Sequence, residues 1–298
     1  MNDINSMNKE RLAADAMHQR IANLDSLPAM PDVAAKLLQL SRDPETMAKD
    51  VAEVIEMDPA IVAQVMHYAR SPWYGYHGEI ETVEQAIFSV LGMEMVTNIA
   101  MGMSAGKVFT IPSTGYLSAK NLWQHAVYCA ALSEALARVM PMHCKIKSGA
   151  AYLSGLLHNI GFMIVAHCFP DEFIELSKKA EMNLTMPMVE LEKQHYGTTH
   201  ADVAAKLMRR WNMPDQVIEV MQHHHDKEYT GEYQREVLLV QVVNRVLANM
   251  EIGDETNCAL DDTVLEILGL KKETIYTVMA NIFDSRTNLD SMIAQLAA

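Results

Sequence analysis

Apolar residues recur along this chain three and four positions apart, the spacing of one helix face, and no segment alternates apolar and polar residues as a strand does. Residues 61–66 hold one such run directly after Asp58-Pro59, an N-cap residue with a proline in the first turn. Thr82 to Gln85 fits the capping-box pattern at the start of another run. The pattern predicts an all-α fold of about thirteen to fifteen helices and no sheet of consequence.

Two polar segments divide this helical pattern. Residues 111–116 combine proline, glycine and hydroxyl side chains, and residues 251–257 form a second polar loop. The first loop is too short for a free linker, so the two halves of the domain are expected to pack as one bundle. The predicted parts are an N-terminal helix over 1–23, a domain over 24–247 with subdomains at about 24–110 and 116–247, and a C-terminal helical extension over 251–298.

Composition and charge narrow the range of partners. Half of the 298 residues are apolar, which is enough for a sizeable core, and 24 Lys plus Arg against 38 Asp plus Glu give a net charge of −14. Binding to nucleic acid needs clustered cations, and here basic residues come at most in pairs, so no direct contact with nucleic acid is expected. Without a signal peptide, and with polar residues interrupting the apolar runs, the chain is expected to be cytoplasmic and not membrane-bound.

The motifs of other catalytic classes give no competing assignment. The one GxSxG match, Gly102-Met-Ser-Ala-Gly106, falls in a helical pattern with no preceding strand, and there is no phosphate-binding GxxxxGK[ST] and no GxGxxG in a strand-to-helix context. The four cysteines have no zinc-knuckle or redox spacing and are expected to be free thiols: Cys129, Cys144, Cys168 and Cys258. Asp202 is expected to be a solvated residue of a first helical turn, and a general base from Asp202 or Asp226 has no support.

The histidines form the most informative pattern. His125, His158, His200 and the pair His224-His225 lie on consecutive predicted helices. Taken alone, each could be an ordinary core or surface residue, and the triple histidine at 223–225 could simply favour the negative end of a helix dipole. Together they could converge, because a helical bundle can project imidazoles from several helices to one point and imidazole binds transition metals well.

The surroundings of these histidines resemble a known superfamily. The segment Gly155-Leu-Leu-His-Asn-Ile-Gly161 is similar to the "GLLHDIG" core of the HD phosphohydrolases, and the order of the histidines is similar to their order of metal ligands, including the HD-GYP branch that cleaves cyclic-di-GMP. The first half is more specific. Residues 27–31 (LPAMP), 56–59 (EMDP), 69–75 (ARSPWYG) and 83–92 (VEQAIFSVLG) together resemble the start of an HDOD domain.

The resemblance also shows what this site lacks. Positions that match the metal-binding aspartates of the hydrolases hold Asn159 and Asn244, and an amide is a neutral, weaker ligand that cannot act as a base. We therefore assign no catalytic residue. The histidines His125, His158, His200, His224 and His225 could still hold a single ion of zinc, iron, nickel or cobalt. The alternative is a hydrogen-bonded cluster of imidazoles without metal.

The expected function follows from the resemblance. An HDOD protein implies a non-catalytic bacterial scaffold in signal transduction that works through protein partners, such as kinases, receivers or cyclic-dinucleotide enzymes. The competing hypothesis is a metal-dependent phosphohydrolase or phosphodiesterase acting on a nucleotide or cyclic dinucleotide. A module that binds a nucleotide without turnover is compatible with either one.

Overall fold

The fold consists of helices joined by short loops, as seen in a computed structural model that describes residues 19–21, 27–256 and 259–298. Within these ranges there is no strand, which confirms the predicted all-α fold class. The α-helices of the first half are α2 (Asp32–Leu40), α3 (Ala48–Ile55), α4 (Pro59–Ala69), α5 (Val83–Ala86) and α6 (Met93–Gly106). The predicted helix over 1–23 lies outside the described residues except for 19–21.

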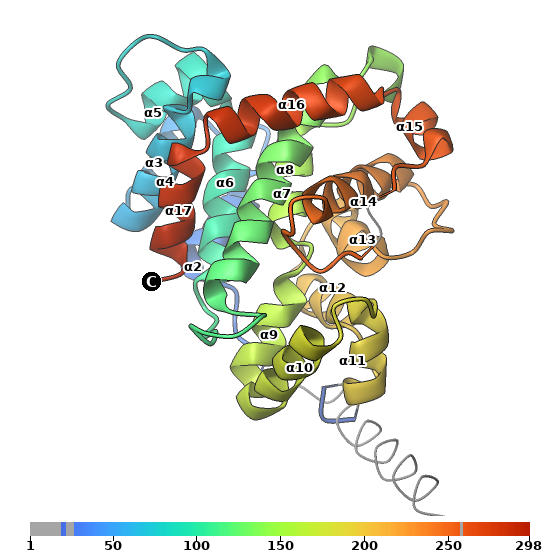
Figure 1. Cartoon of the computed structure of the whole chain (residues 1–298). Coiled ribbons are helices and arrows are strands. Elements are labelled where there is room, and N and C mark those ends of the chain that lie inside the picture. The colour runs from blue at the N-terminus through green and yellow to red at the C-terminus, as the bar shows by residue number, and fades with distance from the viewer. Residues whose placement is uncertain (1–18, 22–26, 257–258) are drawn as a thin grey trace, which may run out of the picture.

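The second half contains longer helices (Figure 1). They are α7 (Ala119–Val139), α8 (Ser148–Leu157), α9 (Ile160–Cys168), α10 (Pro170–Met182), α11 (Met188–Tyr196), α12 (His200–Arg210), α13 (Asp215–His223) and α14 (Gln234–Ala248). The C-terminal helices are α15 (Asp262–Leu268), α16 (Lys272–Asp284) and α17 (Thr287–Leu296). The described residues thus hold sixteen α-helices, α2 to α17, so the expected number was too low, because several helices are very short.

Local sequence signals explain several helix starts. The Asp58 carboxylate accepts hydrogen bonds from the amides of Ala60 and Ile61, and so caps α4 as expected. Thr82 caps α5 through the amide of Gln85, but the Gln85 side chain accepts from Glu81 rather than closing a full capping box. The run after α5 is a π-helix, η2 (Ile87–Leu91), and two 3₁₀ turns complete the elements, η1 (Pro72–Tyr74) and η3 (Met142–Cys144).

The most apolar segment of the second half forms helices α8 and α9. The whole stretch Ser148–Cys168, which covers α8 and α9, is long and apolar enough by length and composition to cross a membrane, contrary to the expectation that polar residues break every apolar run. All of that window is buried inside the fold, so these side chains pack against other helices of the chain. His158 and Asn159 divide the stretch into two helices, so the polar residues of this apolar segment lie at its bend.

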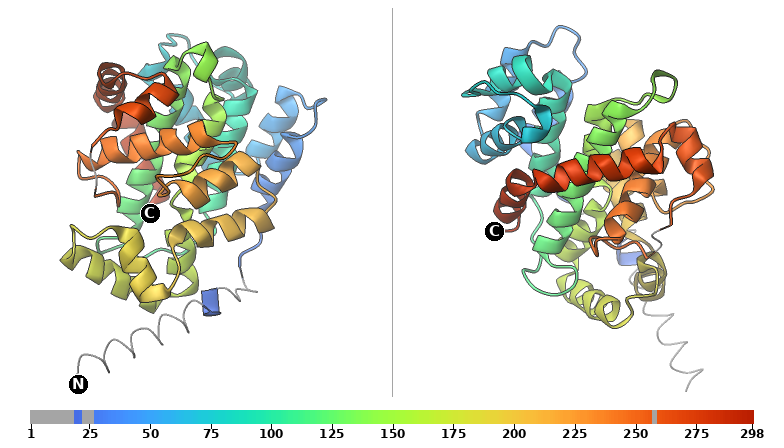
Figure 2. Two further views of the ribbon diagram at one scale, coloured as in Figure 1. Left: turned by 90° about the vertical axis from the view of Figure 1, so that its right-hand side faces the viewer. Right: turned by 45° about the horizontal axis from the view of Figure 1, so that its top comes forward.

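The C-terminal helices return to both halves of the domain. In Figures 1 and 2, α16 runs across α7, and α17 lies beside α4. The Tyr128 ring on α7 stacks on Phe283 with centroids 4.7 Å apart, and its hydroxyl donates to Asp290 at 2.7 Å. Gln64 on α4 donates to Gln295 at 2.7 Å. The helices of the predicted C-terminal extension therefore pack against both halves of the domain.

Candidate functional site

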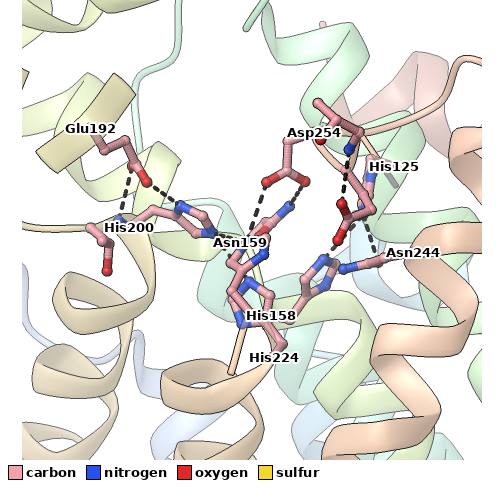
Figure 3. Close-up of polar contacts among 12 residues, drawn as sticks. His125, His158, Asn159, Glu192, His200, His224, Asn244 and Asp254 are labelled. Atoms are coloured by element: carbon pink, nitrogen blue, oxygen red, sulfur yellow. Dashed lines mark hydrogen bonds and ion pairs between the residues drawn. The ribbon is translucent and has the colours of Figure 1, made fainter. Parts of the chain in front are cut away.

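Five histidines from four places in the sequence meet in the interior of the second half (Figure 3). His125 comes from the middle of α7, His158 from the end of α8, His200 from the first residue of α12, and His224 and His225 from the end of α13. The first four are almost completely buried, and His225 is half-buried. The structure thus brings together all five histidines singled out from the sequence.

Two glycines of the Gly155 to Gly161 segment make this convergence possible. A Cβ on Gly155 would lie 2.8 Å from the backbone oxygen of Cys129, so its absence lets α8 approach α7 closely. A Cβ on Gly161 would lie 1.9 Å from the backbone oxygen of His200, so its absence lets α9 approach the start of α12. The glycines on either side of His158 therefore set the distances between the helices that carry the histidines.

The rings fall into two groups. The histidine pair consists of His125 and His158, whose Nε2 atoms are 3.1 Å apart. The histidine trio consists of His200, His224 and His225, and the Nε2 of His200 lies 3.1 Å from that of His224 and 3.2 Å from that of His225. The rings of His158 and His224, with centroids 5.0 Å apart, join the two groups.

In three of these rings, the Nδ1 nitrogen, which faces away from the other imidazoles, lies next to a hydrogen-bond acceptor. The Nδ1 of His158 lies 2.8 Å from the carbonyl of Gly155, and the Nδ1 of His224 lies 2.7 Å from the carbonyl of Met221. The Nδ1 of His200 lies 2.7 Å from a carboxylate oxygen of Glu192. Since these partners only accept, each Nδ1 carries the hydrogen, and the Nε2 of the neutral ring presents a lone pair.

The Nε2 atoms of the histidine pair can form a hydrogen bond with each other, whereas the buried Nδ1 of His125 has no hydrogen-bond partner. His125 can donate from Nε2 to the lone pair of His158 or to Asn244 Oδ1, which is 3.1 Å away. Asn244 Oδ1 also accepts from the Cys129 thiol at 3.5 Å. Burial raises the pKa of Cys129, so this sulfur stays a neutral thiol. Asn244 therefore acts as a hydrogen-bond acceptor here.

The histidine trio is arranged differently. When neutral, both His200 and His224 point an Nε2 lone pair at the other across 3.1 Å, and only a proton or a cation between them makes that contact favourable. Metal–nitrogen bonds of about 2.0–2.1 Å place neighbouring ligand atoms roughly 3 Å apart, which agrees with the spacing of the trio. The donor set and its geometry thus fit one transition-metal ion.

Two carboxylates at the site were not expected from the sequence. Glu192 on α11 is fully buried and accepts hydrogen bonds from both the amide and the Nδ1 of His200. Asp254 comes from the second polar loop, and its Oδ1 accepts a hydrogen bond from Asn159 Nδ2 at 2.9 Å. Its Oδ2 lies 3.5 Å from His225 Nε2. The acidic composition of that loop was visible in the sequence, but nothing local showed that it folds over the histidines.

Burial and these carboxylates set the charge states. Burial lowers the pKa of His125, and it lowers the pKa values of His158 and His224 well below the usual range, with neighbouring imidazoles adding to the effect. Burial also opposes protonation of His200, but the Glu192 carboxylate outweighs it and raises the pKa of His200. Burial favours a protonated Asp254, yet the imidazoles of His225 and His200 hold its pKa well below the usual range.

The other candidates form their hydrogen bonds and ion pairs outside the five histidines, although the Asp202 carboxylate adds to the raised pKa of His200. Asp202 is exposed and accepts a hydrogen bond from the Thr199 hydroxyl at the start of α12, as expected for a first-turn residue. Asp226 is exposed and pairs with His223. Cys144 is a buried free thiol and Cys168 a half-buried one, whereas Cys258 lies outside the described residues.

A cavity of about 120 Å³ opens beside the histidine pair. Its polar lining includes His125, Asn159, Glu251 and Asp254, and its apolar lining comes mainly from α7, α8 and α9. Among the described residues that line it there is no lysine or arginine. The field in the cavity is therefore negative and unfavourable to an anionic ligand.

Comparisons with known proteins agree with this architecture. The HDOD domain profile matches residues 27–227. An uncharacterized protein of Treponema pallidum (strain Nichols) is 27% identical over 212 residues, which are 70% of this chain and 40% of that protein.

Solved structures give the same result at the level of the fold. A candidate signal transduction protein of Marinobacter aquaeolei VT8 superimposes with a TM-score of 0.80 at 27% identity, over 97% of this chain and 66% of that chain. A candidate metal-dependent phosphohydrolase of Shewanella amazonensis SB2B superimposes with a TM-score of 0.68 at 18% identity, over 98% of this chain and 100% of that one. The chain thus spans less than two thirds of the Treponema and Marinobacter proteins.

Proposed function

The chain belongs to the HDOD domain family, and from this premise we propose that it is a regulatory protein of bacterial signal transduction that does not hydrolyse phosphoesters and acts through protein partners. The likeness to the Marinobacter protein, which is described as belonging to signal transduction, supports the general role. Kinases, receivers and cyclic-dinucleotide enzymes are the proposed partners, and the cytoplasm is the proposed location.

One observation carries the proposal that the site is not hydrolytic. The cavity beside the histidines is lined by the carboxylates Glu251 and Asp254 and, among the described residues, by no lysine or arginine. Enzymes that transfer or cleave phosphoryl groups stabilise the growing negative charge with cations. A pair of divalent ions could provide this charge, but a pair needs several anionic ligands, and Asn159 and Asn244 supply none.

We further propose that the site holds a single transition-metal ion, zinc, iron, nickel or cobalt, among His125, His158, His200, His224 and His225. His200 and His224 offer lone pairs at the right spacing, and Glu192 and two backbone carbonyls hold the rings of His200, His224 and His158 in one tautomer. When bound, such an ion supplies a Lewis-acidic centre that can be structural or can respond to metal supply. Glu192 and the two carbonyls orient the imidazoles, and His200 and His224 are buried.

The test is a screen for hydrolysis by the full chain. Purified protein is supplied with manganese, iron or nickel and then incubated with nucleoside mono-, di- and triphosphates and cyclic dinucleotides. The proposal expects no phosphate release and no conversion of the nucleotides above the rate of the His200→Ala variant. A His143→Ala variant, which changes an exposed histidine, serves as the matched control.

An enzyme-like rate would overturn the proposal. If wild type and His143→Ala both turn over a phosphoester, and His200→Ala loses that activity, then the site is hydrolytic and the phosphohydrolase hypothesis is correct. Binding of a nucleotide without turnover, measured as a rise in melting temperature, would instead identify a nucleotide-binding regulatory module.

A further inference from the structure

The second polar loop forms a strap over the histidine centre. The strap, residues 251–256, joins α14 to α15 and lies outside the region that the HDOD domain profile matches. Within it Asp254 is buried, whereas its neighbours are exposed or half-buried. A surface loop that buries its one central carboxylate among imidazoles needs a reason, because burying a charge is costly unless it is paired.

The backbone of the strap is shaped to bring Asp254 inward. Glu251 and Gly253 have positive φ values of 58° and 103°, so the chain turns sharply on both sides of Ile252. A Cβ on Gly253 would lie 1.8 Å from His125 Nδ1, so the strap lies directly against the ring of the histidine pair. Glycine at this position permits both the turn and the close approach.

The two oxygens of Asp254 have different partners. Oδ1 accepts the hydrogen bond from Asn159, whereas Oδ2 has no hydrogen bond and lies 3.5 Å from the Nε2 of His225. That Nε2 is in turn 3.2 Å from the Nε2 of His200. A fully buried carboxylate oxygen that accepts no hydrogen bond and lies 3.5 Å from an imidazole nitrogen of the trio is an arrangement that a bound cation would complete.

We propose that Asp254 is the carboxylate ligand of the single metal ion, together with His200, His224 and His225, and that metal binding thereby fastens the strap. This inference rests on the metal binding proposed above. It also explains Asn159. The carboxylate absent from position 159 is supplied by the strap, and the amide at 159 donates the hydrogen bond that orients it. Within the five-histidine site proposed above, this places the ion at the trio, and the histidine pair packs beside it through the contact of the His158 and His224 rings.

The test measures zinc binding to the full chain after removal of metal with EDTA. Zinc is titrated by calorimetry into wild type, Asp254→Asn and the matched control Glu266→Gln, which removes the same charge from an exposed position of α15, outside the cavity lining. The affinity of Asp254→Asn should fall about tenfold or more, because an amide is a weaker ligand than a carboxylate. Glu266→Gln should stay within about twofold of wild type.

A second readout follows the strap itself. Zinc should slow amide hydrogen exchange at residues 251–256 in wild type but not in Asp254→Asn. Because Asp254→Asn could destabilise the fold, a Gly253→Ala variant provides an independent test: it keeps the carboxylate but displaces the strap from His125, and its zinc affinity should fall similarly.

Equal zinc affinity in wild type, Asp254→Asn and Gly253→Ala would overturn the inference, as would zinc-independent exchange of the strap. The two proposals can fail separately. If wild type hydrolyses a phosphoester and Asp254→Asn binds zinc weakly, the proposed regulatory function is rejected, but the assignment of Asp254 as a metal ligand stands. Absence of hydrolysis together with unchanged zinc binding would reject the ligand alone.

Discussion

Among the buried ionisable groups of helix α7, His125 and Glu134 lie on opposite faces and differ in what surrounds them. His125 and Glu134 are nine positions apart on this helix, about two and a half turns, so they point to opposite sides. His125 faces the histidine centre and the strap. Glu134 lies near Tyr68 on α4, Tyr74 on η1 and Tyr152 on α8, where the two halves of the domain meet.

Burial is sufficient to explain the raised pKa of Glu134. Burial raises the pKa of Glu134 to about 7, although Arg138, Tyr74 and Trp73 favour the charged form. Its cation, Arg138, is 3.4 Å away and nearly half exposed, so it compensates only in part. Among the residues that the structure describes, no cluster of metal-ligating side chains includes this carboxylate, and we interpret the region as structural.

The histidine centre differs because several donor atoms meet there. Its rings are buried like Glu134, but Glu192, Asp254 and backbone carbonyls fix their orientation. A shifted pKa is therefore not by itself a mark of function, since both faces of α7 show one. Convergence of several oriented ligand atoms distinguishes the candidate site.

The two regions also respond to pH in opposite directions. His158 and His224 have lowered pKa values, so the unfolded chain binds more protons below about pH 6.5 and stability falls as the pH decreases. His200, with a raised pKa, acts in the opposite sense. Glu134 has a raised pKa, so the unfolded chain binds fewer protons than the folded one between about pH 4.5 and 7, and stability falls as the pH increases.

The largest change should come from breaking the histidine centre through its backbone packing. Gly161→Ala places a Cβ 1.9 Å from the oxygen of His200 and 2.6 Å from its carbonyl carbon, and backbone atoms cannot yield as a side chain can. We expect a loss of about 3 kcal/mol or more in unfolding free energy, together with loss of zinc binding as α12 moves away. Urea denaturation and zinc titration measure the two effects.

The control for this variant is Gly231→Ala, at an exposed turn where the added Cβ meets only the far end of the Tyr229 ring. It should leave zinc affinity unchanged and alter stability by less than about 1 kcal/mol. If Gly161→Ala binds zinc like wild type, the close approach of α9 to α12 does not position His200.

A somewhat smaller change in unfolding free energy is expected from a substitution on the opposite face of α7. Glu134→Gln removes the group whose pKa is raised from 4.5 to about 7, and each unit of that difference corresponds to about 1.4 kcal/mol. The variant should be close to wild type in stability at pH 5 and more stable by about 3 kcal/mol at pH 8. Urea denaturation at the two pH values measures this difference.

The matched control is Glu53→Gln on α3, whose carboxylate is exposed and pairs with Lys49 at 3.6 Å. Its stability relative to wild type should change little between the same pH values. A Glu134→Gln variant with the same small pH dependence would mean that Glu134 is charged in the folded protein, and the contrast between the faces of α7 would disappear.

Much of the fold could be predicted from local signals in the sequence. The Asp58 cap, and Pro31, Pro187 and Pro214, mark helix starts that the structure has at α4, α2, α11 and α13. The extra helices were harder to predict because their boundaries depend on tertiary packing. The four-residue α5 continues directly into a π-helix, and α17 is a separate helix that packs against α4 and α7.

The site was predictable where it follows a motif and not where it depends on a loop. The five histidines were identified from their order along the chain, and the structure places them together. That they bind metal stays a prediction. Asp254 and Glu192 could not be identified, because an acidic residue in a polar loop or on a helix is most often solvated. Only the three-dimensional path of the strap and of α11 brings these carboxylates to the rings.

The smallest effect should come from a third polar contact of α7, which joins it to the C-terminal helices. Tyr128→Phe removes the 2.7 Å hydrogen bond to Asp290 but keeps the ring that stacks on Phe283. Because Asp290 is about half exposed and can bond to water instead, we expect a loss of about 1 kcal/mol in unfolding free energy and no change in zinc affinity. Tyr276→Phe, at an exposed ring on α16, is the control. A loss of zinc binding in Tyr128→Phe would instead mean that the C-terminal helices are coupled to the metal site through α7 as well as through the strap.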